Sequence, residues 1–226
     1  MRYIASKKLL FIHIPKTGGV SIEDLIYVNF KNVMRLKHHW RGLPGRHITP
    51  KQLRENYWVP IIRNEICGFA FVRHPVAWYK SAWRWFQDVQ KNREGYKNKP
   101  YAALFKSFKW HPKKPLLPLS ILPFDEFIFQ VTELHPGFLS DLYQMYLDDP
   151  AISFVGRTET LDVDARTILE LESNVKVPRL NASMTPAPVV AKNSDVEKAI
   201  LDSEKRAIDQ YYSTDTIKYR HVKDWK

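Results

Sequence analysis

Cysteine is almost absent from this chain, whose only cysteine is Cys67. A single cysteine excludes a disulfide within the chain, and its place in an apolar run predicts a buried thiol in a reducing compartment. Long apolar runs are missing at the N-terminus too. The apolar segment that ends at His13 is too short, and too soon interrupted, for a signal peptide or a membrane span. We therefore expect a soluble, cytoplasmic protein.

Several diagnostic motifs are also missing. The chain has no internal repeat, no low-complexity tract and no zinc-finger spacing of cysteine and histidine. It lacks the G-x-x-x-x-G-K-[ST] pattern of the common P-loop, and no aspartate stands out as a Walker-B ligand for magnesium. These absences argue against a zinc-dependent module and against an ordinary ATPase.

What the chain does have is apolar residues and positive charge. Its 226 residues are 44% hydrophobic and 13% aromatic, which predicts one folded domain over residues 1–226. Lysine and arginine total 35 against 24 acidic residues, a formal charge of +11. Such an excess attracts polyanions: nucleic acid, anionic polysaccharide or phosphorylated cofactors. Basic residues crowd between Arg35 and Arg54 and again between Lys106 and Lys114, either as solvated surface or as contacts to an anionic acceptor.

The order of apolar runs and helical patterns predicts an α/β fold with a mainly parallel sheet flanked by helices. Strands are expected at 8–14, 32–36, 66–72 and 152–155. Helices are expected after the Gly18-Gly19 turn, from Thr49, from Pro75, over 124–147 in two pieces, up to Ser173, and from Ser194. Thr49 with Gln52, and Ser194 with Glu197, have capping-box spacing.

The segment Pro15-Lys16-Thr17-Gly18-Gly19-Val20-Ser21 follows the first strand and predicts an anion-binding turn. Adjacent glycines let backbone N–H groups approach an anion closely, and the following helix adds its positive N-terminal end. Lys16 supplies a full charge, while Thr17 and Ser21 supply hydroxyl donors. A second arrangement, Phe71-Val72-Arg73-His74-Pro75 with Ser81 behind it, follows a later strand. Two such units suggest a ligand with phosphates at both ends.

These segments resemble the two phosphate motifs of sulfotransferases that use 3′-phosphoadenosine-5′-phosphosulfate (PAPS). Phe11–Ser21 resembles the 5′-phosphosulfate loop, and Phe71–Ser81 the 3′-phosphate motif. Phe154–Glu159 and Leu180-Asn181-Ala182-Ser183 are similar to further segments of the carbohydrate-type branch. This chain is less similar to the cytosolic small-molecule sulfotransferases, because the phosphosulfate loop of those enzymes has a different sequence signature. A bacterial-type enzyme with a single P-loop-like domain is therefore expected.

The resemblance implies roles for these residues. Lys16 would neutralise charge on the bridging oxygen as sulfate leaves. The 5′-phosphate would be held by Thr17, Gly18, Gly19, Val20 and Ser21. Arg73 and Ser81 would clamp the 3′-phosphate, an arginine being suited to a multidentate contact. Asn181 and Ser183 would add further donor contacts, and adenosine 3′,5′-bisphosphate would be the product.

Sulfuryl transfer needs no metal in principle, but it needs a base for the acceptor's hydroxyl proton. His47 is our choice, because it precedes the capped helix at Thr49, where carbohydrate-type relatives similarly place a base. His13 and His74 are expected to be structural or to support neighbouring groups. The fallback bases are His38 and His39, with Glu55 and Glu65 as weaker options; His221 is expected at the surface.

The acceptor is expected to be a hydroxyl-bearing carbohydrate or glycan, either neutral or anionic. The basic stretch from Arg35 to Arg54 and the proline-broken loop from Lys99 to Pro123 are the candidates for contacting it. Two alternatives stay open: an ATP-dependent, kinase-like phosphotransferase, and a basic nucleic-acid-binding module. The helix from Pro75 is rich in aromatics, which we interpret as packing residues and not as a base-stacking platform.

Overall fold

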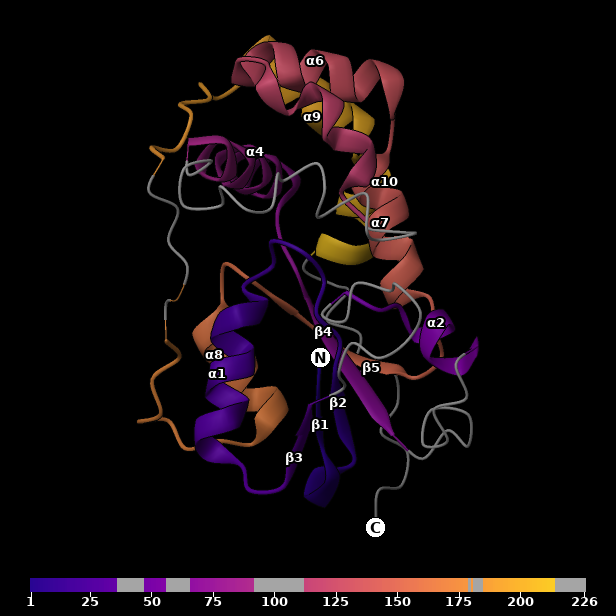
Figure 1. Cartoon of the computed structure of the whole chain (residues 1–226), viewed down its shortest axis with the longest axis vertical. Coiled ribbons are helices and arrows are strands. Elements are labelled where there is room, and N and C mark those ends of the chain that lie inside the picture. Colours follow the sequence, from indigo (N-terminus) through magenta and orange to yellow (C-terminus); the bar gives the residue numbers. More distant parts are fainter. Residues whose placement is uncertain (36–46, 56–65, 92–111, 179, 181–184, 214–226) are drawn as a thin grey trace.

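The computed structural model describes residues 1–35, 47–55, 66–91, 112–178, 180 and 185–213 (Figure 1). In these ranges the strands are β1 (Arg2–Ile4), β2 (Leu9–Phe11), β3 (Val33–Arg35), β4 (Cys67–Val72) and β5 (Ile152–Arg157). The helices are α1 (Gly19–Asn29), α2 (Pro50–Glu55), α4 (Pro75–Lys91), α6 (Phe124–Leu134), α7 (Phe138–Leu147), α8 (Leu161–Leu169), α9 (Asp195–Ser203) and α10 (Lys205–Ala207). Short helical turns are η1 (Ala5–Lys7), η3 (Lys114–Leu116), η4 (Pro118–Ile121) and η5 (Ile208–Tyr212).

The sheet has the strand order β3-β1-β2-β4-β5. β2, β4 and β5 are parallel, while β1 runs antiparallel to both of its neighbours, β2 and β3. From β2 the chain crosses to β3 on one side of the sheet, and β4 is later added on the other side of β2. The order therefore reverses between β2 and β4, and ligands of open α/β sheets bind beyond the carboxyl ends of strands at such a point.

The expected fold class is confirmed, and most of the predicted elements are present. Thr49 and Gln52 form the predicted reciprocal cap, with N···O distances of 3.0 and 3.2 Å. Ser194 accepts the backbone N–H of Glu197 at 3.2 Å at the start of α9. Two boundaries were wrong. β2 is shorter than the predicted strand over 8–14, and α8 ends at Leu169, because Glu170 adopts a left-handed backbone (φ 52°).

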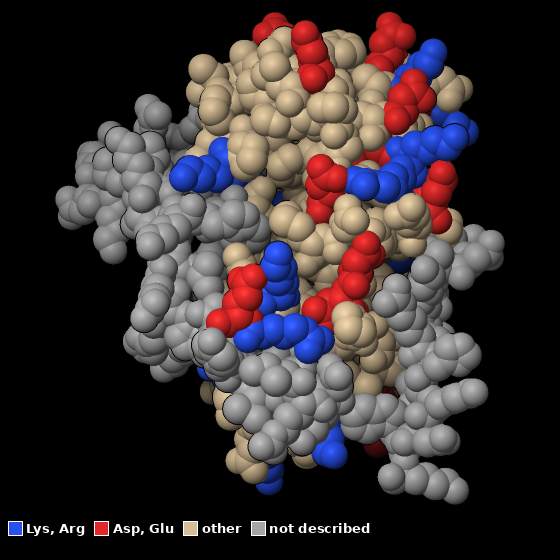
Figure 2. Space-filling model, turned by 90° about the vertical axis from the view of Figure 1, so that its right-hand side faces the viewer, with Lys and Arg blue, Asp and Glu red and all other residues tan. Residues whose placement is uncertain are grey.

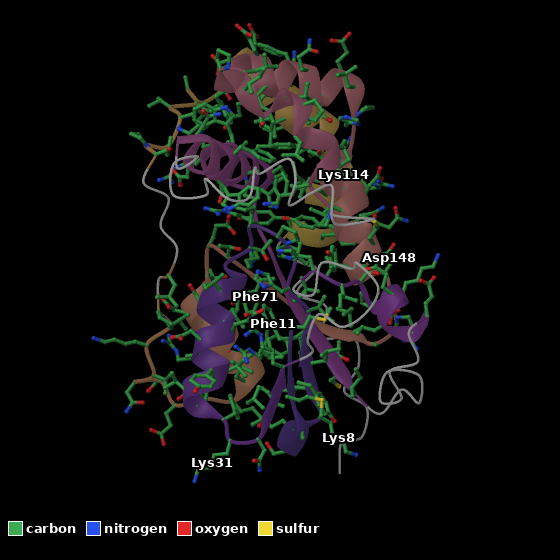
Figure 3. The ribbon with its side chains drawn as sticks, in the orientation of Figure 1. Lys8, Phe11, Lys31, Phe71, Lys114 and Asp148 are labelled. Atoms are coloured by element: carbon green, nitrogen blue, oxygen red, sulfur yellow. The ribbon has the colours of Figure 1, made fainter. Side chains whose placement is uncertain are left out.

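The two faces of the sheet bury alternate residues of the strands, as the period of two requires. Leu9, Phe11, Phe69 and Phe71 point to the face covered by α1 and α8, and Figure 3 shows Phe11 and Phe71 side by side there. Their ring centroids are 6.4 Å apart. On the other face lie residues that pack against helices α2, α4, α6, α7, α9 and α10: Leu10, Ile12, Ala70 and Val72.

A buried carboxylate, Glu204, joins the helices that gather beyond the carboxyl ends of the parallel strands (top of Figure 1). It accepts the hydroxyl of Tyr79 on α4 and the backbone N–H groups of Leu139 and Ser140 at 3.0 and 2.9 Å. The Ser140 hydroxyl donates to it as well, at 2.8 Å. Glu204 thereby satisfies orphan donors in the first turn of α7, where a negative charge is also favoured.

The surface of the described part mixes both charges. On the face in Figure 2, basic side chains lie next to acidic ones. Ion pairs among the described residues include Arg54 with Asp149, at 2.7 Å, and Arg206 with Asp141. Cys67 is buried, as predicted. None of the described helices has both the length and the apolarity needed to cross a bilayer.

Candidate active site

A cavity of about 820 Å³ lies where the segments following β2, β4 and β5 meet. That volume is within the range of cofactor sites. Among the residues that the structure describes, its wall is made of nineteen from six parts of the chain: His13, Pro15, Lys16, Gly18, Gly19, Val20, Ser21, His47, Arg73, Ser81, Trp85, Asp88, Lys113, Thr158, Glu159, Leu161, Asp162, Val177 and Leu180. The turn after β2 and the turn after β4, separated in the sequence, thus contribute to one cavity.

The turn after β2 is held by its backbone conformation and by long-range hydrogen bonds. Lys16 and Gly18 both have positive φ angles, 67° and 78°, and Gly18 is the residue that precedes α1. The indole N–H of Trp78 on α4 donates to the carbonyl of Pro15 at 2.8 Å. This turn directs the N-terminus of α1, with its unpaired backbone N–H groups, at the cavity.

Gly19 has a steric reason to be glycine. A Cβ at this position would lie 2.1 Å from the imidazole of His13, so the ring packs directly on the backbone where α1 begins. The Nδ1 of His13 is 3.1 Å from Oε1 of Glu23, which also accepts the α-ammonium of Met1 at 3.1 Å. Because that carboxylate accepts, Nδ1 of His13 is the nitrogen that carries the proton. His13 is thereby fixed in its orientation, as a supporting role requires.

His47 reaches the cavity just ahead of α2. Its Nδ1 lies 2.9 Å from the carbonyl oxygen of His13, and since a carbonyl can only accept, Nδ1 must be the donor. In the neutral ring the lone pair is then on Nε2. The imidazole rings of His13 and His47 meet edge to face, with their centroids 4.7 Å apart. The hydroxyl of Tyr146 donates a hydrogen bond to the His47 carbonyl at 2.6 Å. The ring is fixed in the tautomer that a base needs.

Lys16 carries a labile proton. Burial, and after it the neighbouring Arg73 guanidinium, lower the pKa of the Lys16 ammonium to about 8, against the effect of Asp88, which raises it. Its Nζ lies 5.7 Å from the centroid of the Trp85 ring. An anion in the cavity would offset the repulsion from Arg73 and favour the protonated form.

Arg73 is positioned by a tyrosine from a distant helix. The hydroxyl of Tyr143 on α7 accepts the Arg73 backbone N–H at 2.8 Å and donates to the Arg73 carbonyl at 2.7 Å. The guanidinium donates through Nη1 to the carbonyl of Lys16 at 3.3 Å. Its Nε is buried and has no hydrogen-bond partner among the described atoms. A buried donor of this kind suits a charged ligand.

The segment after β5 closes another side of the cavity. Thr158 donates both its backbone N–H and its hydroxyl to the carbonyl of Val72, at 2.8 and 2.9 Å. Glu159 accepts the backbone N–H of His74 at 3.0 Å. Leu161 packs on Gly18, where an added Cβ would lie 3.2 Å from its side chain. The turns after β2, β4 and β5 are therefore bonded or packed to one another.

Sequence reasoning assigned no site role to several residues of the wall. Trp85 and Asp88 follow Ser81 on α4 at helical spacing, so all three face the cavity. Lys113 was expected either on a solvated surface or in contact with an anionic acceptor, and the structure buries it. The one available signal was the i, i+4, i+7 spacing from Ser81, and the aromatics of this helix were interpreted as packing residues.

Not every predicted residue lies on the cavity. Thr17 is buried and donates its hydroxyl to the carbonyl of Ile14 at 2.9 Å, so any contact with a ligand would use its backbone N–H. Glu55 ends α2 and is not part of the wall. Other predictions fall outside the described residues: His38, His39, Glu65, Asn181, Ser183, His221 and most of the two candidate acceptor segments.

Comparison with known proteins identifies the family of the chain. The family model described as "Sulfotransferase family" matches residues 2–220, which is nearly the whole chain. No curated protein and no solved structure matches it. The match contains both phosphate-type turns, His47 and the segment after β5. The chain belongs to the sulfotransferase family, whose chemistry is sulfuryl transfer.

Proposed function

We propose that the cavity binds PAPS and that the protein transfers its sulfuryl group to a hydroxyl of a carbohydrate or glycan. The observation that carries this proposal is that Lys16 and Arg73, 57 residues apart, line one cavity and are bonded to each other through the Lys16 carbonyl. A ligand with an anionic group at each end can meet both turns at once. The volume of about 820 Å³ suits a nucleotide of this size.

The residues present fit such a donor. The start of α1 offers backbone N–H groups from Gly18 onward for the 5′-phosphate, with Lys16 beside them. The buried Nε of Arg73 and the Ser81 hydroxyl suit the 3′-phosphate. The backbone N–H of Leu180 donates to the hydroxyl of Ser21 at 3.1 Å, so the chain reaches the cavity at residue 180, and the roles of Asn181 and Ser183 stay predictions.

In the proposed reaction the acceptor oxygen forms a bond to sulfur while the bond from sulfur to the bridging oxygen breaks. The electron pair of that bond goes to the 5′-phosphate, and the acceptor's hydroxyl proton goes to Nε2 of His47. The products are a sulfate ester and adenosine 3′,5′-bisphosphate. His47 is suited to accept this proton because the His13 carbonyl fixes its tautomer. Lys16 is suited to stabilise the leaving group because its ammonium can offset the charge on the leaving oxygen.

The donor assignment is tested by calorimetry with adenosine 3′,5′-bisphosphate, which we expect to bind the wild-type protein tightly. Arg73→Ala should weaken this nucleotide far more than adenosine 5′-monophosphate, because only the former has a 3′-phosphate. Lys51→Ala, which removes an exposed charge on α2, is the matched control and should change neither affinity. No binding by the wild type, or equal losses for the two nucleotides in Arg73→Ala, would refute the assignment.

The base is tested by His47→Ala. Turnover of PAPS with a responsive acceptor, found by screening oligosaccharides, lipids and phenols, should fall by about 10²–10⁴. Affinity for adenosine 3′,5′-bisphosphate should stay near that of the wild type. His135→Ala, at the end of α6 and away from the cavity wall, is the histidine control. Retained turnover would reassign the base, and a requirement for ATP and Mg²⁺ would favour a kinase instead.

A further inference from the structure

Lys113 occupies an unusual position for a lysine. Its side chain is buried, with a relative exposure of 3%, while the next residue, Lys114 (labelled in Figure 3), is exposed. The Lys113 ammonium lies 2.9 Å from the centroid of the Trp85 ring, and the Lys16 ammonium lies 5.7 Å from the same centroid. Both lysines line the cavity. Two ammonium groups are thus held against one indole.

Its position disfavours the charged form of Lys113. Burial, followed by the charge of Lys16, lowers the pKa of Lys113 well below that of an exposed lysine. Asp88 in the same wall offsets part of the positive charge, and the indole face attracts both ammonium groups. An anion placed at these two lysines would favour the charged form of each.

The location of Lys113 separates it from the clamp for the 3′-phosphate. Along α4 the cavity wall runs from Ser81 to Trp85 and then Asp88, away from Arg73 at the amino end of the helix. Lys113 packs at the Trp85 end. The predicted 5′-phosphate contacts come from the start of α1. Lys113 therefore shares the Trp85 ring with Lys16, and it was not among the residues predicted to bind either phosphate.

We propose that Lys113 is a second cation for the sulfuryl group of the donor, binding its oxygens while Lys16 serves the bridging oxygen. This inference rests on the proposed function. An ammonium group has three N–H donors and no acceptor, so it can serve several oxygens of one sulfuryl group. The charge of that group is spread over its oxygens and is present in the donor but absent from the product nucleotide.

The test compares the donor with the product nucleotide on the same variant. Lys113→Met keeps most of the side-chain volume and removes the charge. By calorimetry without acceptor, it should weaken PAPS by about tenfold or more and adenosine 3′,5′-bisphosphate by less than about twofold. Turnover should fall as well. Lys113→Arg should restore part of the PAPS affinity, and Lys114→Met, the exposed neighbour, should leave the affinities for both nucleotides at their wild-type values.

Two results would overturn the inference. Equal loss of both nucleotides would mean that Lys113 serves a phosphate or only maintains the fold, and no loss of either would mean that it merely packs on Trp85. Thermal unfolding of each variant shows whether it is folded. If Lys113→Met is not folded, Lys113→Gln allows the same comparison of the affinity losses for PAPS and adenosine 3′,5′-bisphosphate. Failure of the wild type to bind adenosine 3′,5′-bisphosphate would instead refute the proposed function.

Discussion

The turns after β2 and β4 perform similar tasks by different physical means. Each follows a buried strand, leads into a helix and lines the same cavity. The β2 turn is shaped mainly by its own residues, through two positive φ angles and the close contact of Gly19 with His13. The β4 turn is fixed by Tyr143, whose hydroxyl holds Arg73 from 70 residues away. One anion site is therefore local in origin, and the other depends on tertiary packing.

The difference matters for how each site fails. The β2 turn should respond most to changes in its own residues, although Trp78 and Arg73 also bond to it, whereas the β4 turn should loosen when α7 shifts or loses one hydroxyl. Substitutions in the two turns should therefore separate loop geometry from helix packing.

The largest effect is expected from Gly19→Ala. The new Cβ would lie 2.1 Å from the His13 ring, so either α1 or the imidazole must move. Overpacking of this kind costs about 1–3 kcal/mol, and the move would also displace the carbonyl that holds His47. We expect a lower free energy of unfolding in a urea titration and loss of most nucleotide binding. Wild-type affinity would show that the turn tolerates a side chain at this position.

A smaller and more selective effect is expected from Tyr143→Phe. Removing the hydroxyl leaves the Arg73 N–H and carbonyl without this partner, at a cost of about 1–3 kcal/mol in the free energy of unfolding. Calorimetry should show weaker binding of adenosine 3′,5′-bisphosphate and little change for adenosine 5′-monophosphate. Equal weakening of both nucleotides would mean that α7 supports the β2 turn as well.

The pH dependence of binding should report Lys16. Its pKa of about 8 means that raising the pH from 7 to 9 removes the proton in the empty cavity, so an anionic nucleotide should bind about tenfold more weakly. The charged groups around the Lys16 ammonium are those of Arg73, Arg84, Asp88 and Lys113.

The stability of the ligand-free protein should change with pH in the opposite direction. Its free energy of unfolding should rise between pH 8 and 10.5, where the unfolded chain binds more protons at Lys16 than the folded chain does. Lys16→Met should flatten much of the binding profile, and an unchanged slope would exclude Lys16 as its source.

The smallest effect is expected from Arg54→Ala on α2. The Arg54–Asp149 pair spans 2.7 Å but is partly exposed, so its loss should cost about 1 kcal/mol or less. His47 precedes α2, whose start is already fixed by Thr49 and Gln52. Turnover should therefore change little, and a large loss would show that this ion pair places the base.

Local signals in the sequence predicted much of the fold. Strands β4 and β5, the break between α6 and α7, and the caps at Thr49 and Ser194 depend on nearby residues, and all are present. β1 was missed because three residues, Arg2–Ile4, are too few for a periodic pattern. The end of α8 was misplaced because a left-handed glutamate is rare and Glu170 gives no sequence signal.

Local sequence signals also predicted much of the candidate site. Lys16, the glycines, Ser21, His47, Arg73 and Ser81 all line the cavity. The Trp85, Asp88 and Lys113 wall was not predicted as a unit, because it joins one helix face to a residue well beyond that helix. Burial of Lys113 follows from its contact with Trp85, and no local pattern distinguishes it from the exposed Lys114.

Glu204 sets a limit on how far the chain could be shortened from its C-terminal side. Removing the residues from Glu204 onward would leave the Tyr79 hydroxyl and the first turn of α7 without their common acceptor, deep in the protein. Tyr143 lies on that same helix, so the damage would extend to the grip on Arg73. A minimal nucleotide-binding fragment must therefore include residue 204, although none of its atoms borders the cavity.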